Sequence, residues 1–167
     1  EAKQEEVTEE TTEEKKEEED KTAESSENSW IEAYQNEVQK FASENEAMYE
    51  LIDITGDDIP ELFISRGEFH AAGVTIFTIV NGEAVNLGEF GSFGEVMYDA
   101  SKKTVRQGFS GQGHTTGSIF RIEDGKENVL VEYDSVDLED EKSFKIDGAE
   151  VTEEEYNSAL EQYSADT

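Results

Sequence analysis

Three Asn-Gly or Asp-Gly dipeptides constrain the fold of this chain more than any other feature of its sequence. They are Asn81-Gly82, Asp124-Gly125 and Asp147-Gly148, and each stands between two runs in which apolar and polar residues alternate. Such dipeptides suit the two left-handed positions of a type I′ turn, which joins neighbouring antiparallel strands. The sequence therefore predicts an antiparallel meander.

Runs with the period of a β-strand occupy most of the sequence from residue 48 to residue 146. They read "MYELIDI", "ELFIS", "VTIFTIV", "EAVNLGEF", "EVMYDA", "TVRQGFS", "SIFRIE", "ENVLVEY" and "SFKI". We expect about eight strands, in a mostly antiparallel sheet that is either barrel-like or two-layered. The pattern alone does not choose between these two arrangements.

A helix is expected on each side of the strands. Ser29 and Glu32 have the spacing of a capping box, and Thr152 and Glu155 repeat that spacing near the end of the chain. Side chains at helical spacing follow each box. These are Trp30, Tyr34, Val38 and Phe41 in a helix of about residues 30 to 43, and Tyr156, Ala159, Leu160 and Tyr163 in a short second helix. The sequence thus predicts an α+β fold, in which the first aromatic face either packs on the sheet or forms a binding stripe.

Residues 1 to 28 differ in composition from the rest of the chain. They read "EAKQEEVTEETTEEKKEEEDKTAESSEN", in which Val7 is the only branched apolar residue and aromatic residues are absent. Such a segment cannot bury enough apolar surface to offset the entropy of ordering it. We expect a disordered acidic tether over residues 1–28 and a single folded domain over residues 29–167. A single charged helix is the alternative for the first segment, because Glu and Lys are good helix formers.

The charge of the chain excludes several classes of partner. Its 43 acidic and 13 basic residues give a formal net charge of -30. Direct binding to nucleic acid or to an anionic lipid surface is therefore not expected. The sequence also contains no cysteine, which excludes a disulfide framework and a thiolate zinc site. No run of apolar residues is long enough for a transmembrane helix.

The stretch "LIDITGDDIPELFIS", residues 51 to 65, contains regularly spaced oxygen donors. Asp53, Asp57 and Glu61 occur at every fourth position, with the Thr55 hydroxyl and the Ile59 carbonyl between them. Ca²⁺ takes about 6–8 oxygen ligands, which alternate residues of a tight loop can supply. The alternative is an Asx-type turn without a metal, in which the carboxylates are simply solvated.

The segment "DITGDDIPEL" resembles the nine-residue calcium loop of FG-GAP repeats, which reads Asp-x-Asn-Gly-Asp-Gly-x-x-Asp-Leu and leads into a strand. It does not match an EF-hand, since Ile64 stands where that loop has a bidentate Glu. The resemblance implies one structural Ca²⁺ and no propeller, because a single such loop is present. The implied ligands are Asp53, Thr55, Asp57, the Ile59 carbonyl and Glu61. Asp58 would then adopt the left-handed backbone usually given to Gly.

The order of elements, together with "YELIDITGDDIPELFIS", "FRIEDGKENVL" and "KIDGAEVTEEEYNSALEQY", resembles poorly characterised surface lipoproteins of Gram-positive bacteria. Such proteins have a lipid-modified Cys, an acidic or Ser/Thr-rich spacer and one domain with a comparable Asp-rich segment. The resemblance implies an extracellular, lipid-anchored location and an export signal upstream of Glu1. The expected function is that of a calcium-stabilised, non-catalytic and monomeric domain that binds a peptide, glycan or protein outside the cell.

Two glycine-rich stretches, "GEFGSFGEV" and "SGQGHTTGS", form a possible ligand-binding loop. Its candidate residues are Phe90, Phe93, Phe109 and His114, although burial of the aromatic rings in the sheet is the alternative. His70 and His114 are the two histidines of the chain. The alternative function is therefore an extracellular hydrolase or hydrolase inhibitor that uses the loop around His114. No nucleophile-elbow motif accompanies it, so an enzyme is not expected.

Overall fold

The computed structural model describes residues 29–42, 47–65 and 73–164, so the predicted tether of residues 1–28 lies outside the described residues. Two helices and ten strands are found within these ranges. They are α2 (Ser29–Ala42), β1 (Met48–Ile52), β2 (Glu61–Ser65), β3 (Val74–Val80), β4 (Glu83–Phe90), β5 (Glu95–Asp99), β6 (Thr104–Gly111), β7 (His114–Glu123), β8 (Lys126–Leu138), β9 (Glu141–Ile146), β10 (Ala149–Val151) and α3 (Glu153–Tyr163).

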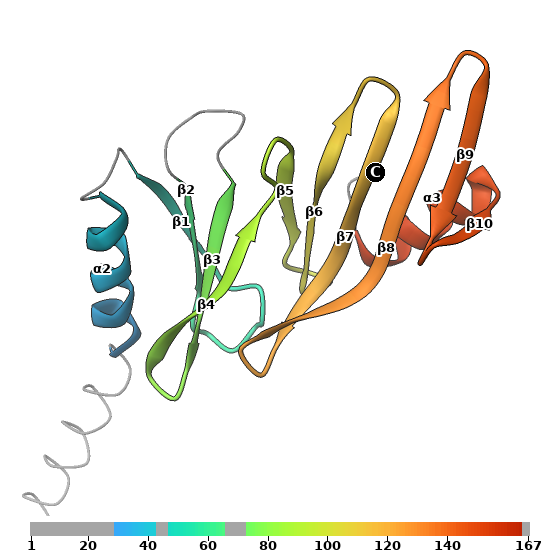
Figure 1. The fold of residues 1–167 in the computed structure, drawn as a ribbon. Helices are drawn as coiled ribbons and strands as arrows, with labels where there is room; N and C mark the ends of the chain where they lie inside the picture. The colour runs from blue at the N-terminus through green and yellow to red at the C-terminus, as the bar shows by residue number, and fades with distance from the viewer. Residues whose placement is uncertain (1–28, 43–46, 66–72, 165–167) are drawn as a thin grey trace, which may run out of the picture.

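The strands form two antiparallel sheets in which spatial neighbours are also neighbours in the sequence (Figure 1). The first sheet has the order β1-β2-β3-β4 and the second has the order β10-β9-β8-β7-β6-β5. The predicted meander is confirmed, and the two-layered alternative holds instead of a closed barrel. The described residues form ten strands, where the sequence predicts about eight. The additional strand after "SFKI", β10, has three residues, which is too short for an alternating pattern to be recognised.

The three predicted hairpin turns have the backbone conformation of type I′ turns. All six residues of Asn81-Gly82, Asp124-Gly125 and Asp147-Gly148 have φ values from 51° to 81°. A type I′ turn requires positive φ at both central residues, which Asn, Asp and Gly adopt most readily. These dipeptides therefore fix the registers of the hairpins β3–β4, β7–β8 and β9–β10.

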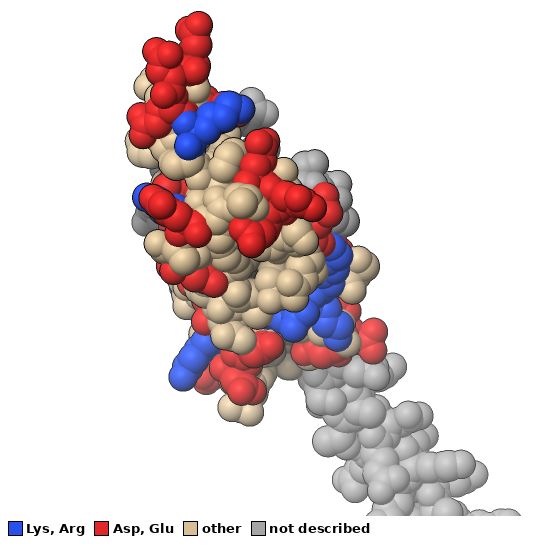
Figure 2. Space-filling model, turned by 90° about the vertical axis from the view of Figure 1, so that its right-hand side faces the viewer, with Lys and Arg blue, Asp and Glu red and all other residues tan. Residues whose placement is uncertain are grey.

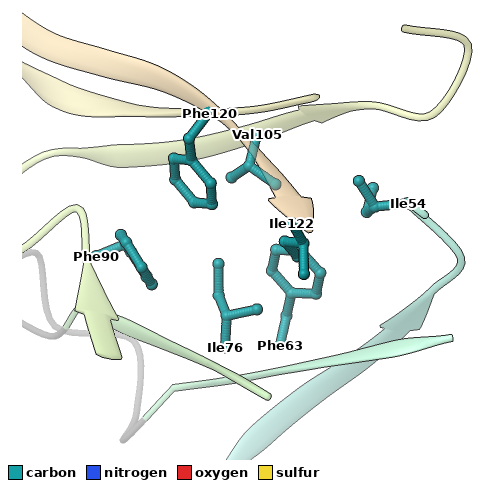
Figure 3. Close-up of a cluster of buried hydrophobic side chains, with 7 residues drawn as sticks. All are labelled: Ile54, Phe63, Ile76, Phe90, Val105, Phe120 and Ile122. Carbon is teal, nitrogen blue, oxygen red and sulfur yellow. The ribbon is translucent and has the colours of Figure 1, made fainter. Parts of the chain in front are cut away.

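A layer of buried side chains joins the two sheets (Figure 3). Adjacent residues of one strand point to opposite faces of a sheet. On β2, Phe63 points into this intersheet core, whereas Leu62 packs under α2. On β7, Phe120 points into the intersheet core, whereas Ile119 packs under α3. The layers are therefore α2, first sheet, second sheet and α3. The intersheet core consists of Ile54, Phe63, Ile76, Phe90, Val105, Phe120 and Ile122.

Both predicted helices are present, and α3 begins directly after the predicted cap residue Thr152. Helix α2 is described from Ser29, the first described residue, and its Tyr34 is 3% exposed against the first sheet. The capping box of α3 is confirmed, because Thr152 Oγ1 accepts from the Glu155 N–H at 3.2 Å and the Glu155 carboxylate accepts from the Thr152 N–H at 2.9 Å. Neither described helix has the length and apolar character needed to cross a membrane.

Candidate functional site

The acidic loop joins β1 to β2 and is anchored in the intersheet core. Ile54, the second residue of the loop, is fully buried there. Gly56 and Asp58 have φ values of 71° and 68°, so the chain reverses direction through two left-handed residues. The left-handed conformation expected for Asp58 is therefore confirmed.

Hydrogen bonds from the backbone hold two of the predicted ligands against the loop. The Asp53 carboxylate accepts from the N–H of Gly56 at 2.6 Å and from the N–H of Asp58 at 3.2 Å. The Asp57 carboxylate accepts from the N–H of Ile59 at 3.0 Å. Since an ionised carboxylate has about four lone-pair sites, both groups retain sites for a further donor or a cation. Asp57 is exposed and Asp53 is half-buried.

Glu61 is held differently from the two aspartates. It is 1% exposed, and its carboxylate accepts from the N–H groups of Ile54 at 3.0 Å and Thr55 at 3.3 Å and from the Thr78 hydroxyl at 3.0 Å. Burial raises the pKa of Glu61, although these hydrogen bonds oppose that effect. With three of about four lone-pair sites used, at most about one remains for a metal ion.

A lysine from the second sheet lies beside the loop. Lys103, in the turn between β5 and β6, donates from Nζ to the carbonyl oxygen of Thr55 at 2.7 Å. A Cβ on Gly56 would lie 2.7 Å from the same nitrogen, so the ammonium group sits directly on this turn. The Thr55 hydroxyl oxygen is buried and has no hydrogen-bond partner. The loop therefore combines a nearby positive charge with one oxygen that still lacks a partner.

The described side chains include no group of three or more His, Asp or Glu residues arranged to hold a metal ion. Glu61 accounts for part of this result, because its carboxylate is turned into the protein. The remaining oxygens are those of Asp53, Asp57 and the Thr55 hydroxyl, with the Ile59 carbonyl and one site on Glu61. All are hard donors of the kind that Ca²⁺ prefers. The loop therefore offers hard oxygen donors, but its three carboxylates are not gathered around one point.

The two glycine-rich stretches meet where β5 begins, because Glu95 pairs with Gly108 and a Cβ on Gly94 would touch the backbone of Gly108 and Phe109. Their aromatic residues nevertheless differ in exposure. Phe90 is 7% exposed and stacks on Phe120 with ring centroids 4.9 Å apart, so it belongs to the intersheet core. Phe93 is 62% exposed in the turn between β4 and β5. Phe109 and His114 lie on the hairpin β6–β7, where both are exposed. Of the predicted ligand-binding residues, the structure therefore leaves three accessible.

Gly117 of the second stretch and Gly108 on the neighbouring strand β6 are explained by close packing. Gly108 and Gly117 are paired across β6 and β7, and a Cβ on either would lie within 2.6 Å of the Tyr133 hydroxyl. This hydroxyl donates to the Gln107 carbonyl at 3.1 Å and accepts from the Arg106 side chain at 3.2 Å. Because Gly108 and Gly117 have no side chains, the Tyr133 ring can lie over β7 and reach the backbone of β6.

His114 has no partner that would activate it as a catalytic base within the described part of the chain. It lies on the strand position that faces Gly111, and the structure gives it no hydrogen bond to a carboxylate or a serine there. The nearby Ser110 and Thr115 hydroxyls are hydrogen-bonded to each other at 3.0 Å. His70 lies outside the described residues.

A groove that the sequence pattern does not predict lies between α2 and β1. The groove has a volume of about 460 Å³, and its walls include Trp30 and Val38 from the helix and Tyr49 and Leu51 from the strand. The helical stripe was predicted to pack on a sheet, which it does, but it also forms one wall of this groove. The sequence does contain an indication of an exposed apolar surface here. The segment "MYEL" places three large apolar residues in one short strand.

No protein-family model, no curated protein and no solved structure matches this chain.

Proposed function

We propose that the chain is a non-catalytic binding domain of the bacterial cell surface, lipid-anchored outside the cell and stabilised by Ca²⁺ in the loop from Asp53 to Glu61. The observation that carries the calcium proposal is the conformation of this loop. Two left-handed residues, Gly56 and Asp58, reverse the chain tightly while Asp53 and Asp57 keep unfilled carboxylate lone pairs.

An ion in this loop would stabilise the fold in two ways: by reducing charge repulsion and by restricting the segments that the loop joins or touches. The chain carries a net charge of -30, so a bound cation lowers the repulsion among its acidic groups. The loop also joins the edge strand β1 to its neighbour β2 and touches Lys103 of the second sheet. Immobilising it would therefore restrict β1 and β2 and the turn between β5 and β6. Ca²⁺ has a structural role here and takes part in no reaction.

The affinity should be low. Thr55 contributes a neutral hydroxyl, and three hydrogen bonds already occupy most of the Glu61 carboxylate. Extracellular calcium modules bind with Kd values of about 10⁻⁴ to 10⁻³ M, and we place this loop in that range. Mg²⁺ should bind less well, because it requires a strict octahedron and gives up its waters reluctantly.

Thermal unfolding in millimolar Ca²⁺ and in chelator tests the calcium proposal. At about 100 times the Kd, an ion that binds only the folded state adds roughly 2.7 kcal/mol to the free energy of unfolding. We expect a rise of several degrees in the melting temperature. Asp57→Ala should abolish the rise, whereas Asp140→Ala, which removes an exposed carboxylate from the turn between β8 and β9, should preserve it. Equal melting temperatures of the wild-type protein with and without Ca²⁺ would show that the loop is only an acidic turn.

The surface location is supported by the acidic spacer-like segment of residues 1–28 and by the resemblance to surface lipoproteins. A diacylated Cys upstream of that segment would hold the domain outside the membrane. The coding sequence upstream of Glu1 tests this part of the proposal. An export signal that ends in a lipid-modified Cys supports it, and a further folded domain without an export signal contradicts it.

A further inference from the structure

Strand β1 is an exposed edge with an unusual number of apolar side chains. It is the outermost strand of the first sheet, and within the described ranges no strand pairs with its outer side. Met48, Tyr49 and Leu51 are 48%, 59% and 42% exposed. Edge strands are commonly protected by lysine, proline or a bulge, because free backbone donors and acceptors invite another strand. Among these devices β1 has neither Lys nor Pro, and its pairing with β2 is regular.

The groove beside β1 extends this apolar surface. Helix α2 packs more closely on β4 than on β1, so Tyr49 and Leu51 of β1 remain partly exposed. Tyr49 and Leu51 form one wall of the groove, and Trp30 and Val38 of α2 form part of the opposite wall. Its volume of about 460 Å³ can take the side chains of a short extended segment.

The other face of β1 carries a negative charge. Side chains alternate along a strand, so Glu50 points away from the groove that Tyr49 and Leu51 line. Glu50 is exposed, and the Tyr98 hydroxyl donates to its carboxylate at a distance of 3.5 Å. A strand added to β1 would therefore place apolar residues in the groove and one residue opposite an exposed carboxylate.

The charge of β1 and of the whole chain favours a basic partner. Glu50 is the one charged residue of β1, and the chain carries a net charge of -30. Acidic side chains are also spread over the opposite side of the molecule, where β9 and α3 lie (Figure 2). A second copy of this chain fits the edge poorly. In a symmetric antiparallel pair centred on β1, Glu50 would lie opposite Glu50 of the other copy, and like charges in that position are destabilising.

We propose that β1 binds an extended segment of a partner protein by strand addition, and that this segment has a basic residue between two apolar residues. The apolar side chains enter the groove beside α2, and the basic side chain pairs with Glu50. Backbone hydrogen bonds to the free edge of β1 supply the rest of the affinity. The inference deepens the proposed binding function, on which it rests, and it does not depend on calcium.

The tryptophan in the groove provides a direct measurement. Trp30 is the only tryptophan of the chain, so its fluorescence can report on peptide binding without a label. The probe is the peptide acetyl-Thr-Val-Lys-Val-Thr-amide, titrated into the full chain. We expect a saturable change in Trp30 fluorescence, and a weaker response to the same peptide with Glu in place of Lys. No saturable change with the Lys peptide at millimolar concentration would overturn the proposal.

Backbone methylation separates strand addition from simple apolar contact. Alternate N–H groups of a strand point toward its partner. Methylating the two Val nitrogens in one peptide, and the Thr and Lys nitrogens in another, should therefore abolish binding in one case and spare it in the other. Equal binding of both methylated peptides would exclude strand pairing.

Substitutions on β1 identify the surface and the partner charge. Glu50→Lys should reverse the preference between the Lys and Glu peptides, and Leu51→Lys should weaken binding of the Lys peptide by about tenfold. Val129→Lys, at a 45% exposed position on β8, is the matched control and should leave binding unchanged. Thermal melts establish that each variant is folded. Unchanged preference in the Glu50 variant would contradict the proposed pairing.

Two further measurements distinguish the outcomes. Sedimentation of the wild-type protein and the Leu51 variant shows whether β1 instead pairs with a second copy; a dimer that the substitution disrupts would overturn the peptide proposal. The titrations are repeated in Ca²⁺ and in chelator. Peptide binding without calcium stabilisation would refute the calcium site alone, and calcium stabilisation without peptide binding would refute strand addition alone.

Discussion

Substitution of Gly117 by alanine tests whether packing within the second sheet explains the glycine-rich hairpin. The φ of Gly117 lies outside the left-handed region, so its backbone is compatible with alanine. In open space such a change stabilises a protein by about 0.4–1 kcal/mol, because it reduces the entropy of the unfolded chain. At Gly117 we expect alanine to destabilise the protein instead. A Cβ there would overlap with the Gln107 carbonyl oxygen and with the Tyr133 hydroxyl.

The size of the effect follows from what must move. The Gln107 oxygen belongs to the backbone of β6, so β6 and β7 must separate locally, and the cost of overpacking is about 1–3 kcal/mol. Displacing Tyr133 also breaks its hydrogen bond to Gln107 or to Arg106, which adds about 1 kcal/mol. We therefore expect Gly117→Ala to lower the free energy of unfolding by about 3 kcal/mol, a large share of the roughly 5–15 kcal/mol typical of a domain.

Urea denaturation followed by circular dichroism measures this difference. Gly148→Ala is the matched control, because Gly148 has a φ of 76° and a Cβ there would meet no atom within 4 Å. The control should lose only about 1 kcal/mol, from the left-handed backbone. The reasoning is refuted if Gly117→Ala is as stable as the wild-type protein, or loses no more stability than Gly148→Ala.

Four other changes, three substitutions and one deletion, test separate parts of the structure. Asp58→Gly should raise the free energy of unfolding by up to about 1 kcal/mol, because it relieves the left-handed backbone at φ 68°; a lower melting temperature would contradict this. Thr152→Ala should cost about 1 kcal/mol through loss of the α3 cap, measured by urea denaturation. Hydrogen bonds from Thr152 lower the pKa of Glu155 from 4.5, so the stabilisation by Glu155 is present above that value and is lost as the pH falls through the lower, folded-state pKa. Glu155→Gln should flatten this part of the stability profile, and an unchanged profile would argue against the cap. Deleting residues 1–28 should leave the melting curve unchanged, and a loss of more than about 1 kcal/mol would show that they contribute to the fold.

Local chemistry explains why much of the fold could be predicted from the sequence. The turn at Asn81-Gly82 and the cap at Thr152 depend on residues within a few positions of one another. The choice between a barrel and two layers depends instead on which faces of distant strands meet, and alternation along one strand does not contain that information. The intersheet contact between Phe90 and Phe120 is an example, because the glycines around Phe90 suggested an exposed loop.

The candidate site shows the same limit at the level of single residues. The spacing of Asp53 and Asp57 located the loop and its left-handed turn, since both are local properties. The environment of Glu61 could have been inferred from its position two residues before Phe63, which places both side chains on the same face of β2. Lys103 could not have been found from sequence, because 48 residues separate it from Thr55 and a tertiary contact between the sheets brings them together.

Neighbouring strands in each sheet are also consecutive in the sequence, and this arrangement affects how the protein folds. Helix α2 and the first sheet occupy residues 29–90, and the second sheet with α3 occupies residues 95–163, so each layer pair is one continuous stretch of chain. Hairpins between consecutive strands close short loops, which lowers the contact order and the entropy lost before native contacts form. Either stretch can therefore begin to fold without the other, and the intersheet core, to which both contribute, forms when they dock. In native-state hydrogen exchange the two stretches should behave as separate cooperative units, with the amides around Ile76 and Phe120 exchanging only when the docked core opens.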